Sequence, residues 1–192
     1  MLSHARENCS CYLQTGAGAF RRGDAADFAA DTGFGLVTST YDSLNHLESL
    51  SALSRCFSNA HAALVAGGMF VFDLNTIQGL DDWNRIRVTD KVDHTVISRG
   101  FFDRKTMRAF KRFSGFYSLP GGLFDRFEED IFNTAFWTRD VVAALHAAGF
   151  ETVYSALLGD LMLAIDNPED NDRVFFVARK PHGGQRGAAD VD

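Results

Sequence analysis

The chain has 192 residues, of which 46% are hydrophobic and 23% are charged, a composition typical of one soluble globular domain. Its formal net charge of −6 argues against nucleic-acid binding, because phosphate contacts need a basic surface. No apolar run reaches the ~18 residues of a membrane span, and no signal peptide is visible. We therefore expect a cytoplasmic protein that binds neither nucleic acid nor a membrane.

The N-terminal part of the chain carries weak signals for secondary structure. Residues 1–8 resemble the end of a helix, because Leu2 and Ala5 are three positions apart and no capping residue precedes them. Residues 12–33 predict a short strand followed by a loop. Residues 34–41 (FGLVTSTY) are rich in β-branched and aromatic side chains and predict a further strand.

Strand, helix and strand are predicted in succession over residues 34–75. Residues 47–65 carry apolar side chains at spacings of three or four, which is the period of one helix face. Gly67 and Gly68 are expected to end this helix. Residues 69–72 form a continuous apolar run, typical of a strand buried on both faces. Such a unit builds a parallel sheet.

Residues 92–136 predict a small three-stranded antiparallel insertion. Its strands are expected at 92–102, 107–117 and 123–136, with turns at 103–105 and 120–122.

The C-terminal part predicts one helix and two strands. Thr138 is expected to cap a helix that ends near Ala148, and residues 150–158 and 173–179 predict the last strands. The polar, glycine-rich residues 181–192 predict a disordered tail.

Two short motifs are weak candidates for chemistry. The glycines of Thr15–Phe20 would suit a phosphate-binding loop only after a buried strand and before a helix; the neighbouring residues favour a plain turn. Cys9 and Cys11 fall short of the about four ligands that a zinc site needs, and Cys56 is the only other cysteine. We expect no metal, and the odd number of cysteines does not predict a disulfide framework.

The segment Asp42–His46 is the strongest candidate for a site. It directly follows a predicted strand, and ligands of parallel α/β sheets bind beyond the carboxyl ends of strands. Asp73 and Asn75 end the next predicted strand, so they are expected at the same edge of the sheet. The alternative is a helix-capping loop, because Asp, Ser and Asn all cap helices well.

The sequence over residues 34–75 closely resembles the class I S-adenosylmethionine (SAM)-dependent methyltransferases, in their small-molecule branch. The resemblance rests on FGLVTSTYDSLNHL and LVAGGMFVFDLNT, on Gly23–Phe28 as the family's "gDa–dF" loop, on Met1–Arg6 as its "ML–AR" helix opening, and on RVFFVARK. It extends to about Lys180. It implies a Rossmann-like α/β sheet in one domain of residues 1–180, with the antiparallel insertion inside it.

The chain departs from the family at its beginning. The family's first strand, Gly-rich loop, first helix and second strand are not found, so the sheet is expected to be incomplete at the N-terminus. The chain would then be a fragment, a half completed by a partner, or a degenerate form that no longer binds SAM. The strand over residues 34–41 would have an open apolar edge, which predicts a marginally stable or self-associating protein.

The resemblance also implies an activity and a set of site residues. The activity is methyl transfer from SAM to a small-molecule acceptor. Asp24 and Ala25 would line the adenine end of SAM, and Thr40 and Tyr41 would lie near its methionine part. His46 would be the base or would orient the acceptor, supported by Asp42 and Asn45.

Two other functions are open on the sequence. The first is a non-catalytic methyltransferase-like subunit that binds a protein partner through its open sheet edge. The second is a nucleotide-dependent oxidoreductase, which the lack of a dinucleotide glycine fingerprint disfavours.

Overall fold

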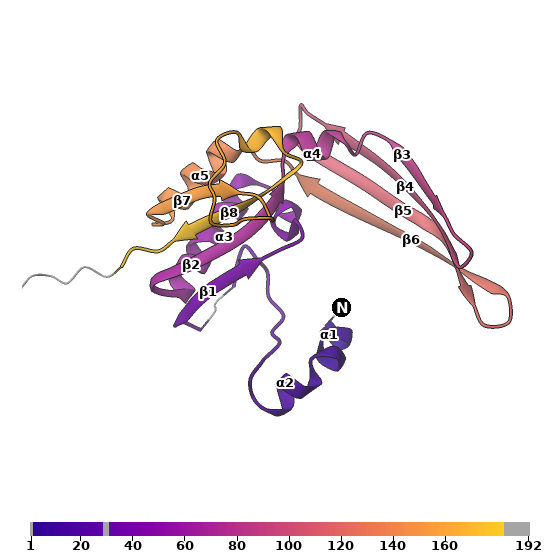
Figure 1. Cartoon of the computed structure of the whole chain (residues 1–192), viewed down its shortest axis with the longest axis horizontal. Helices are drawn as coiled ribbons and strands as arrows, with labels where there is room; N and C mark the ends of the chain where they lie inside the picture. Colours follow the sequence, from indigo (N-terminus) through magenta and orange to yellow (C-terminus); the bar gives the residue numbers. More distant parts are fainter. Residues whose placement is uncertain (1, 29–30, 183–192) are drawn as a thin grey trace, which may run out of the picture.

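The computed structural model describes residues 2–28 and 31–182, which form two sheets joined near α4 (Figure 1). The helices are α1 (Leu2–Asn8), α2 (Ser10–Gln14), α3 (Leu50–Ala63), α4 (Ile77–Asp81) and α5 (Thr138–Ala147), with 3-10 turns η1 (Ser43–His46) and η2 (Pro168–Asp170). The strands are β1 (Phe34–Ser39), β2 (Leu64–Asn75), β3 (Ile86–Asp90), β4 (His94–Asp103), β5 (Arg108–Leu119), β6 (Leu123–Thr134), β7 (Thr152–Ala156) and β8 (Arg173–Arg179).

The central sheet has the strand order β1-β2-β8-β7. β1 runs parallel to β2, whereas β8 runs antiparallel to both β2 and β7. α3 and α5 pack against one face of this sheet (Figure 1). The predicted strand–helix–strand unit is therefore confirmed as β1, α3 and β2.

Four phenylalanines hold α3 against the sheet. Phe57 of α3 lies 5.2 Å from Phe72 of β2, measured between ring centroids. Phe72 in turn stacks on Phe70 at 4.7 Å and on Phe176 of β8 at 5.0 Å. All four rings are buried, so this stack is the centre of the main core, where aromatic pairs add to the gain from burial alone.

The end of α3 differs from the prediction. The helix stops at Ala63 and β2 begins at once, so Gly67 and Gly68 lie inside the strand and do not end the helix. Lys180 takes the role expected of glycine, because its Nζ donates to His61 O at 2.8 Å and to Leu64 O at 2.7 Å. A cation suits the negative end of a helix. Gly67, with a φ of 76°, adopts the left-handed backbone conformation at the irregular start of β2.

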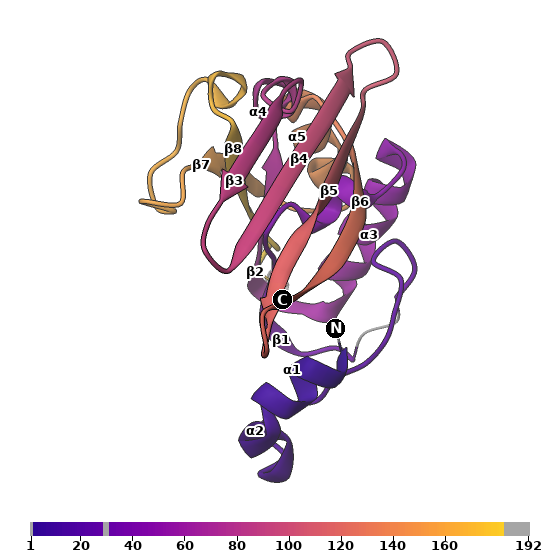
Figure 2. The ribbon, with the colours of Figure 1, turned by 90° about the vertical axis from the view of Figure 1, so that its right-hand side faces the viewer.

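The insertion is larger than predicted. It is a four-stranded antiparallel sheet of order β3-β4-β5-β6, which begins at Ile86. The structure confirms the strands at β4, β5 and β6, but the prediction missed α4 and β3. All five residues of β3 are exposed, so this strand has no burial pattern that sequence could reveal. The sheet extends from the core and curves away from it (Figures 1 and 2).

The helix over residues 138–148 is confirmed as α5, but Thr138 does not cap it. Thr138 is the first helical residue, and its backbone N–H and Oγ1 both donate to Oε1 of Glu169 at 2.8 Å. The cap is therefore a carboxylate from η2, 31 residues further along the chain. The last two predicted strands are confirmed as β7 and β8.

The N-terminal segment agrees with the prediction in its first helix but not in the strand that was expected after it. Helical structure is confirmed over Leu2–Asn8 (α1), but the predicted short strand within residues 12–33 is wrong: α2 ends at Gln14 and an irregular loop follows. This polar loop has one isolated bridge, between Asp24 and Asp27. Residues 29–30 and most of the predicted disordered tail (183–192) lie outside the described residues.

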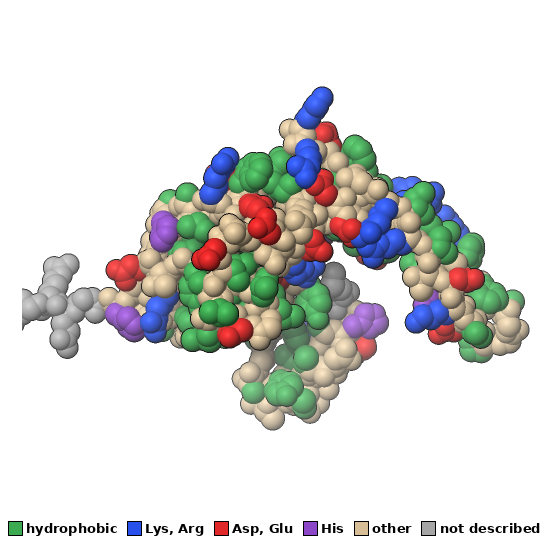
Figure 3. Space-filling view, turned by 45° about the horizontal axis from the view of Figure 1, so that its top comes forward, with side chains coloured by type: hydrophobic (Ala, Val, Ile, Leu, Met, Phe, Trp, Pro, Cys, Tyr) green, Lys and Arg blue, Asp and Glu red, His purple; other side chains and the backbone are tan. Residues whose placement is uncertain are grey.

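The second face of the central sheet carries exposed apolar side chains. Leu36 is 52% exposed and Met69 is 39% exposed, and both line a shallow groove with Tyr154 and Met162. Hydrophobic side chains are visible over this half of the molecule in Figure 3. No helix in residues 2–28 and 31–182 is long and apolar enough to cross a membrane.

Gly79 allows α4, and with it the insertion, to pack against the segment before β8. A Cβ at this position would collide with the carbonyl carbon and oxygen of Asp172. Gly79→Ala should therefore lower the free energy of unfolding by about 2 kcal/mol, the usual cost of overpacking. Urea unfolding followed by circular dichroism measures this. Gly35→Ala, which meets nothing within 4 Å, is the control, and an equal effect of both substitutions would contradict the assigned packing.

Candidate active site

The chain turns sharply where β1 ends. Tyr41 and Asp42 both have left-handed backbone conformations, with φ of 61° and 49°, which cost non-glycine residues about 1 kcal/mol or more each. Two hydrogen bonds hold the turn: Asp42 N donates to Oδ2 of Asp73 at 3.0 Å, and Ser43 Oγ donates to Thr40 O at 2.6 Å. The turn leaves the side chain of Tyr41 83% exposed.

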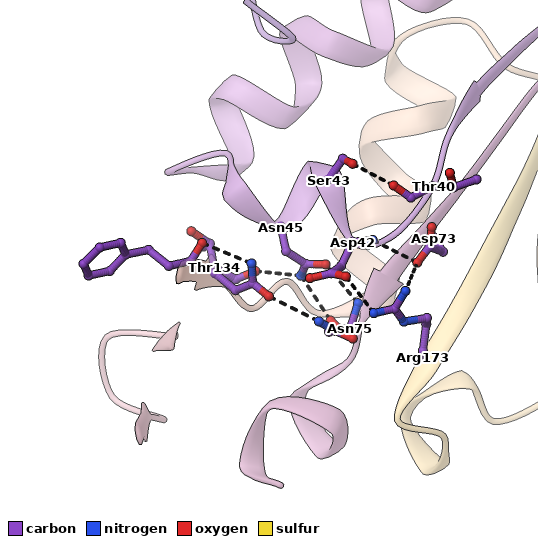
Figure 4. A network of polar contacts seen from close by, with 10 residues as sticks. Thr40, Asp42, Ser43, Asn45, Asp73, Asn75, Thr134 and Arg173 are labelled. Atoms are coloured by element: carbon purple, nitrogen blue, oxygen red, sulfur yellow. Dashed lines mark hydrogen bonds and ion pairs between the residues drawn. The ribbon is translucent and has the colours of Figure 1, made fainter. Parts of the chain in front are cut away.

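Arg173 joins the turn to the end of β2 (Figure 4). Its guanidinium donates to Oδ2 of Asp73 at 2.9 Å and to Oδ1 of Asp42 at 2.6 Å. Asp73 is completely buried, and a buried carboxylate needs a paired cation to remain charged. Its second oxygen, Oδ1, has no hydrogen-bond partner among the described residues.

Asn45 forms the second half of the network (Figure 4). Its Nδ2 donates to Asn75 O at 3.2 Å and to Thr134 O at 2.9 Å, and its Oδ1 accepts from Asn75 N at 2.9 Å. Asn75 Nδ2 donates to Oδ1 of Asn133 at 3.2 Å. Asn45 therefore ties the start of the insertion to its end, and its amide is fully buried.

The expected shared edge is thus observed. Asp42 and Asn45 lie with Asp73 and Asn75 at the carboxyl ends of β1 and β2. The capping alternative fails for Asp42: it precedes η1, but its side chain makes no capping hydrogen bond there and pairs with Arg173.

His46 lies at the same edge but outside this network. It is exposed at the end of η1 and lines a shallow pocket with Glu48, Arg108 and Asp130. Arg108 fixes one wall of the pocket, because it donates to Thr134 Oγ1 at 2.7 Å.

Asp24 and Ala25 lie in a separate hollow. Both are exposed, and they line the hollow with Arg21, Arg22 and Phe34. Oδ1 of Asp24 accepts from Ala26 N at 2.8 Å, which shapes the loop. Among the described residues, no hydrogen bond joins this pair to Thr40 or Tyr41.

The cysteines do not assemble into a site. In the described part of the chain, no three His, Cys, Asp or Glu side chains group as metal ligands. Burial raises the pKa of the Cys56 thiol to about 11, and the charge of Asp24 acts in the same direction. A thiol with that pKa is protonated at neutral pH and is a poor nucleophile. Thr15–Phe20 is confirmed as a turn: it ends α2, with Gly16 at φ 70°.

Sequence reasoning missed Arg173 and Asn133. Asn133 lies near the end of β6, in a segment for which the sequence predicts only a strand. One feature of the sequence points to Arg173: it is a charged residue directly before the apolar run VFFVA. A cation next to a buried strand needs an acidic partner.

Comparison with known proteins identifies the fold. No protein-family model and no curated protein matches the chain. Among solved structures, an S-adenosylmethionine-dependent methyltransferase from Clostridium acetobutylicum superimposes with a TM-score of 0.81 at 18% identity over 94% of this chain and 71% of its own.

Two sugar-modifying enzymes are also similar. The sugar N-methyltransferase KedS8 from Streptoalloteichus has a TM-score of 0.63 at 22% identity, over 83% of this chain and 61% of its own. The amino pentose methyltransferase CalS10 from Micromonospora echinaspora has a TM-score of 0.58 at 20% identity, over 82% and 63%. The chain therefore has the Rossmann-like α/β fold of class I SAM-dependent methyltransferases, as the sequence predicted.

Arg173 should contribute strongly to stability, because its loss leaves Asp73 buried without a cation. Arg173→Leu should lower the free energy of unfolding by about 3 kcal/mol. Arg126→Leu breaks only a surface pair with Glu128 and should cost less than about 1 kcal/mol. Equal losses in urea unfolding would contradict the role of Arg173, and addition of Asp73→Asn to Arg173→Leu should restore part of the loss.

Proposed function

We propose that this chain is a methyltransferase that uses SAM and acts on a small molecule. The observation that carries the proposal is the position of the polar network: it lies at the carboxyl ends of β1 and β2, where α/β folds of this kind bind their ligands. The similar structures support the substrate class, since two of them carry the names of sugar and amino pentose methyltransferases.

Two features of the described residues fit SAM. Asp24 presents an exposed carboxylate in a hollow, and a carboxylate accepts hydrogen bonds from an amine such as that of adenine. Tyr41 presents an exposed aromatic side chain from a turn that hydrogen bonds hold in place. We assign Asp24 and Ala25 to the adenine end and Thr40 and Tyr41 to the methionine end.

The chemistry needs alignment more than acid–base power. When bound, SAM supplies an electrophilic methyl group on a positively charged sulfur. The residues of this chain then have to hold the acceptor in line with that methyl group, and alignment alone can contribute several kcal/mol (about 7 or more in favourable cases). The rigid turn at Asp42, tied to Asp73 and Arg173, supplies a fixed wall for this purpose.

His46 is the best-placed proton acceptor. Its imidazole is exposed at the carboxyl edge, beside Glu48 and Asp130, whereas both Asp42 and Asn45 are occupied in holding the turn. We assign the removal of the acceptor's proton to His46, and the positioning of the turn to Asp42 and Asn45.

Calorimetric titration with SAM and with its demethylated product tests cofactor binding, and we expect saturable binding of both. His46→Ala should then lower the rate of methyl transfer by about 100-fold, the usual contribution of a general base, without changing the affinity for SAM. His4→Ala, at an exposed position of α1, is the matched control. A folded chain that binds neither ligand would contradict the proposal.

The free edge of β1 favours a second function, the binding of another strand. β1 is the first strand of the central sheet, so one row of its backbone groups has no strand partner among the described residues. Phe34 is 45% exposed and Leu36 is 52% exposed. Residues 34–41 contain neither charge nor proline, the features that usually protect an edge. We propose that this edge pairs with a second copy or with a partner chain.

Self-association should therefore be measurable by light scattering after gel filtration. Leu36→Lys should shift the protein toward the monomer, because a lysine on an edge strand opposes pairing. Leu158→Lys, at an exposed apolar residue outside the strands, should leave the distribution unchanged. A wild-type chain that stays monomeric at high concentration would contradict self-pairing and leave a partner chain as the occupant.

A further inference from the structure

The pocket beside His46 lies between η1 and the second sheet. His46 and Glu48 line it on one side, and Arg108 of β5 with Asp130 and Phe132 of β6 line it on the other. β6 also packs against η1, so the two walls are held together. The volume of about 480 Å³ falls within the ~300–1,000 Å³ of small-molecule sites. The pocket can therefore hold a small molecule next to the imidazole to which we assign proton removal.

Arg108 brings a positive charge to the wall of this pocket. The side chain is half-buried, and its guanidinium donates to two uncharged oxygens, Thr134 Oγ1 at 2.7 Å and Glu48 O at 3.4 Å. Both bonds use Nη1, so Nε and Nη2 have no hydrogen-bond partner in the described part of the chain. Among those residues, Arg108 also forms no ion pair. The guanidinium is thus held in place while most of its donors remain available.

The two carboxylates that the second sheet places beside Arg108 have other partners. Asp103 lies directly opposite Arg108 in the pairing of β4 with β5, but its oxygens accept two hydrogen bonds of 2.9 Å from the turn that follows β4. Asp130 accepts two bonds of 2.6 Å from Arg112, a bidentate pair. Neither carboxylate is therefore left to compensate the charge of Arg108, and a negatively charged ligand could do so.

A row of phenylalanines lies next to Arg108 on the same face of the second sheet. Phe101, Phe110 and Phe132 are directly opposite one another on β4, β5 and β6. Phe110 follows Arg108 by two positions, so both side chains point to the same face. The rings of Phe110 and Phe132 lie 5.2 Å apart between centroids, and Phe132, which lines the pocket, is 52% exposed. The pocket thus offers an aromatic surface beside a cation.

We propose that Arg108 binds an anionic group of the methyl acceptor, a carboxylate or a phosphate, and that Phe132 contacts the apolar part of the same molecule. The planar fork of a guanidinium matches the oxygens of both anions. The acceptor's reacting atom would then lie toward His46, on the opposite wall of the pocket. That the ligand is the methyl acceptor rests on the proposed function, whereas the anion site itself does not.

NMR titration of the isotope-labelled chain with benzoate, benzamide and phenyl phosphate tests the site without SAM. Benzoate and benzamide have the same shape but differ in charge, so benzoate should bind saturably and benzamide about tenfold more weakly. The tighter of benzoate and phenyl phosphate identifies the anion class. Arg108→Gln should weaken the binding of that anion by about tenfold or more, the size of one charge-assisted hydrogen bond. Equal binding of benzoate and benzamide would overturn the proposal.

Arg99→Gln is the matched control for general charge effects. Arg99 lies on the same face of the second sheet, opposite Arg112, and forms no ion pair among the described residues, but it does not line the pocket. Its substitution should leave anion binding unchanged, and equal losses for both arginine substitutions would overturn the proposal. Arg108→Lys should keep part of the affinity, because an ammonium retains the charge without the planar fork. Urea unfolding checks that each variant is folded.

Two further variants test the pocket without changing Arg108. Glu48→Gln removes a negative charge from the lining and leaves the backbone oxygen that holds Arg108, so anion binding should tighten by about twofold or more. Weaker binding would contradict the site. Phe132→Ala should weaken the binding of benzoate by about threefold and leave that of acetate unchanged. An equal loss for acetate would contradict the aromatic contact.

Kinetics and calorimetry then connect the site to the reaction. In an active enzyme, Arg108→Gln should raise KM for acidic acceptors by about tenfold, with kcat and the affinity for SAM unchanged. Anion binding that depends on Arg108, in a chain that binds no SAM, would refute the proposed function and leave the anion site standing. SAM binding without such anion binding would overturn this inference alone.

Discussion

The buried carboxylate of Asp73 is the constraint on which the site depends. A fully buried charge at the end of β2 is unstable without a cation, and Arg173 at the start of β8 supplies it. Asp73 also accepts from the backbone of Asp42, which offsets the left-handed conformation of the turn. The order of β2 and β8 in the sheet and the direction of the chain after β1 are therefore linked by one ionic group.

The same group explains why the turn can project Tyr41 into solvent. A strained, exposed loop is normally mobile, but this loop is fixed at three points: Thr40 O, Asp42 N and the Asp42 carboxylate. Rigid placement of side chains at a sheet edge is what an alignment-based reaction requires. Stability and proposed activity thus draw on the same few contacts.

Local patterns predicted most of the fold, and long-range contacts account for the errors. The unit β1–α3–β2 was predictable because its apolar periodicity is set by burial within one segment. Gly67 misled the prediction because the end of α3 is satisfied by Lys180, more than a hundred residues away. β3 was not predictable, because none of its side chains is buried.

The residues of the candidate site divide in the same way, into those that local sequence position predicts and those that only long-range contacts bring together. Asp42, Asn45, Asp73 and Asn75 were predictable from their places after two strands. Arg173 was not, since it meets Asp42 across 131 residues of chain. The strand predicted before β1 is wrong, because a strand there would find no neighbouring strand among the described residues with which to form hydrogen bonds.

The amide of Asn45 has a consequence for the path of the chain. It holds Asn75, where the chain leaves the central sheet, and Thr134, where the chain returns. Asn75 and Asn133, 58 positions apart in the chain, are joined by a hydrogen bond. The insertion between them is therefore closed where it meets the central sheet. Two asparagine side chains thus fix where the chain leaves the central sheet and where it returns, and these contacts set no limit on the length of the hairpins between them.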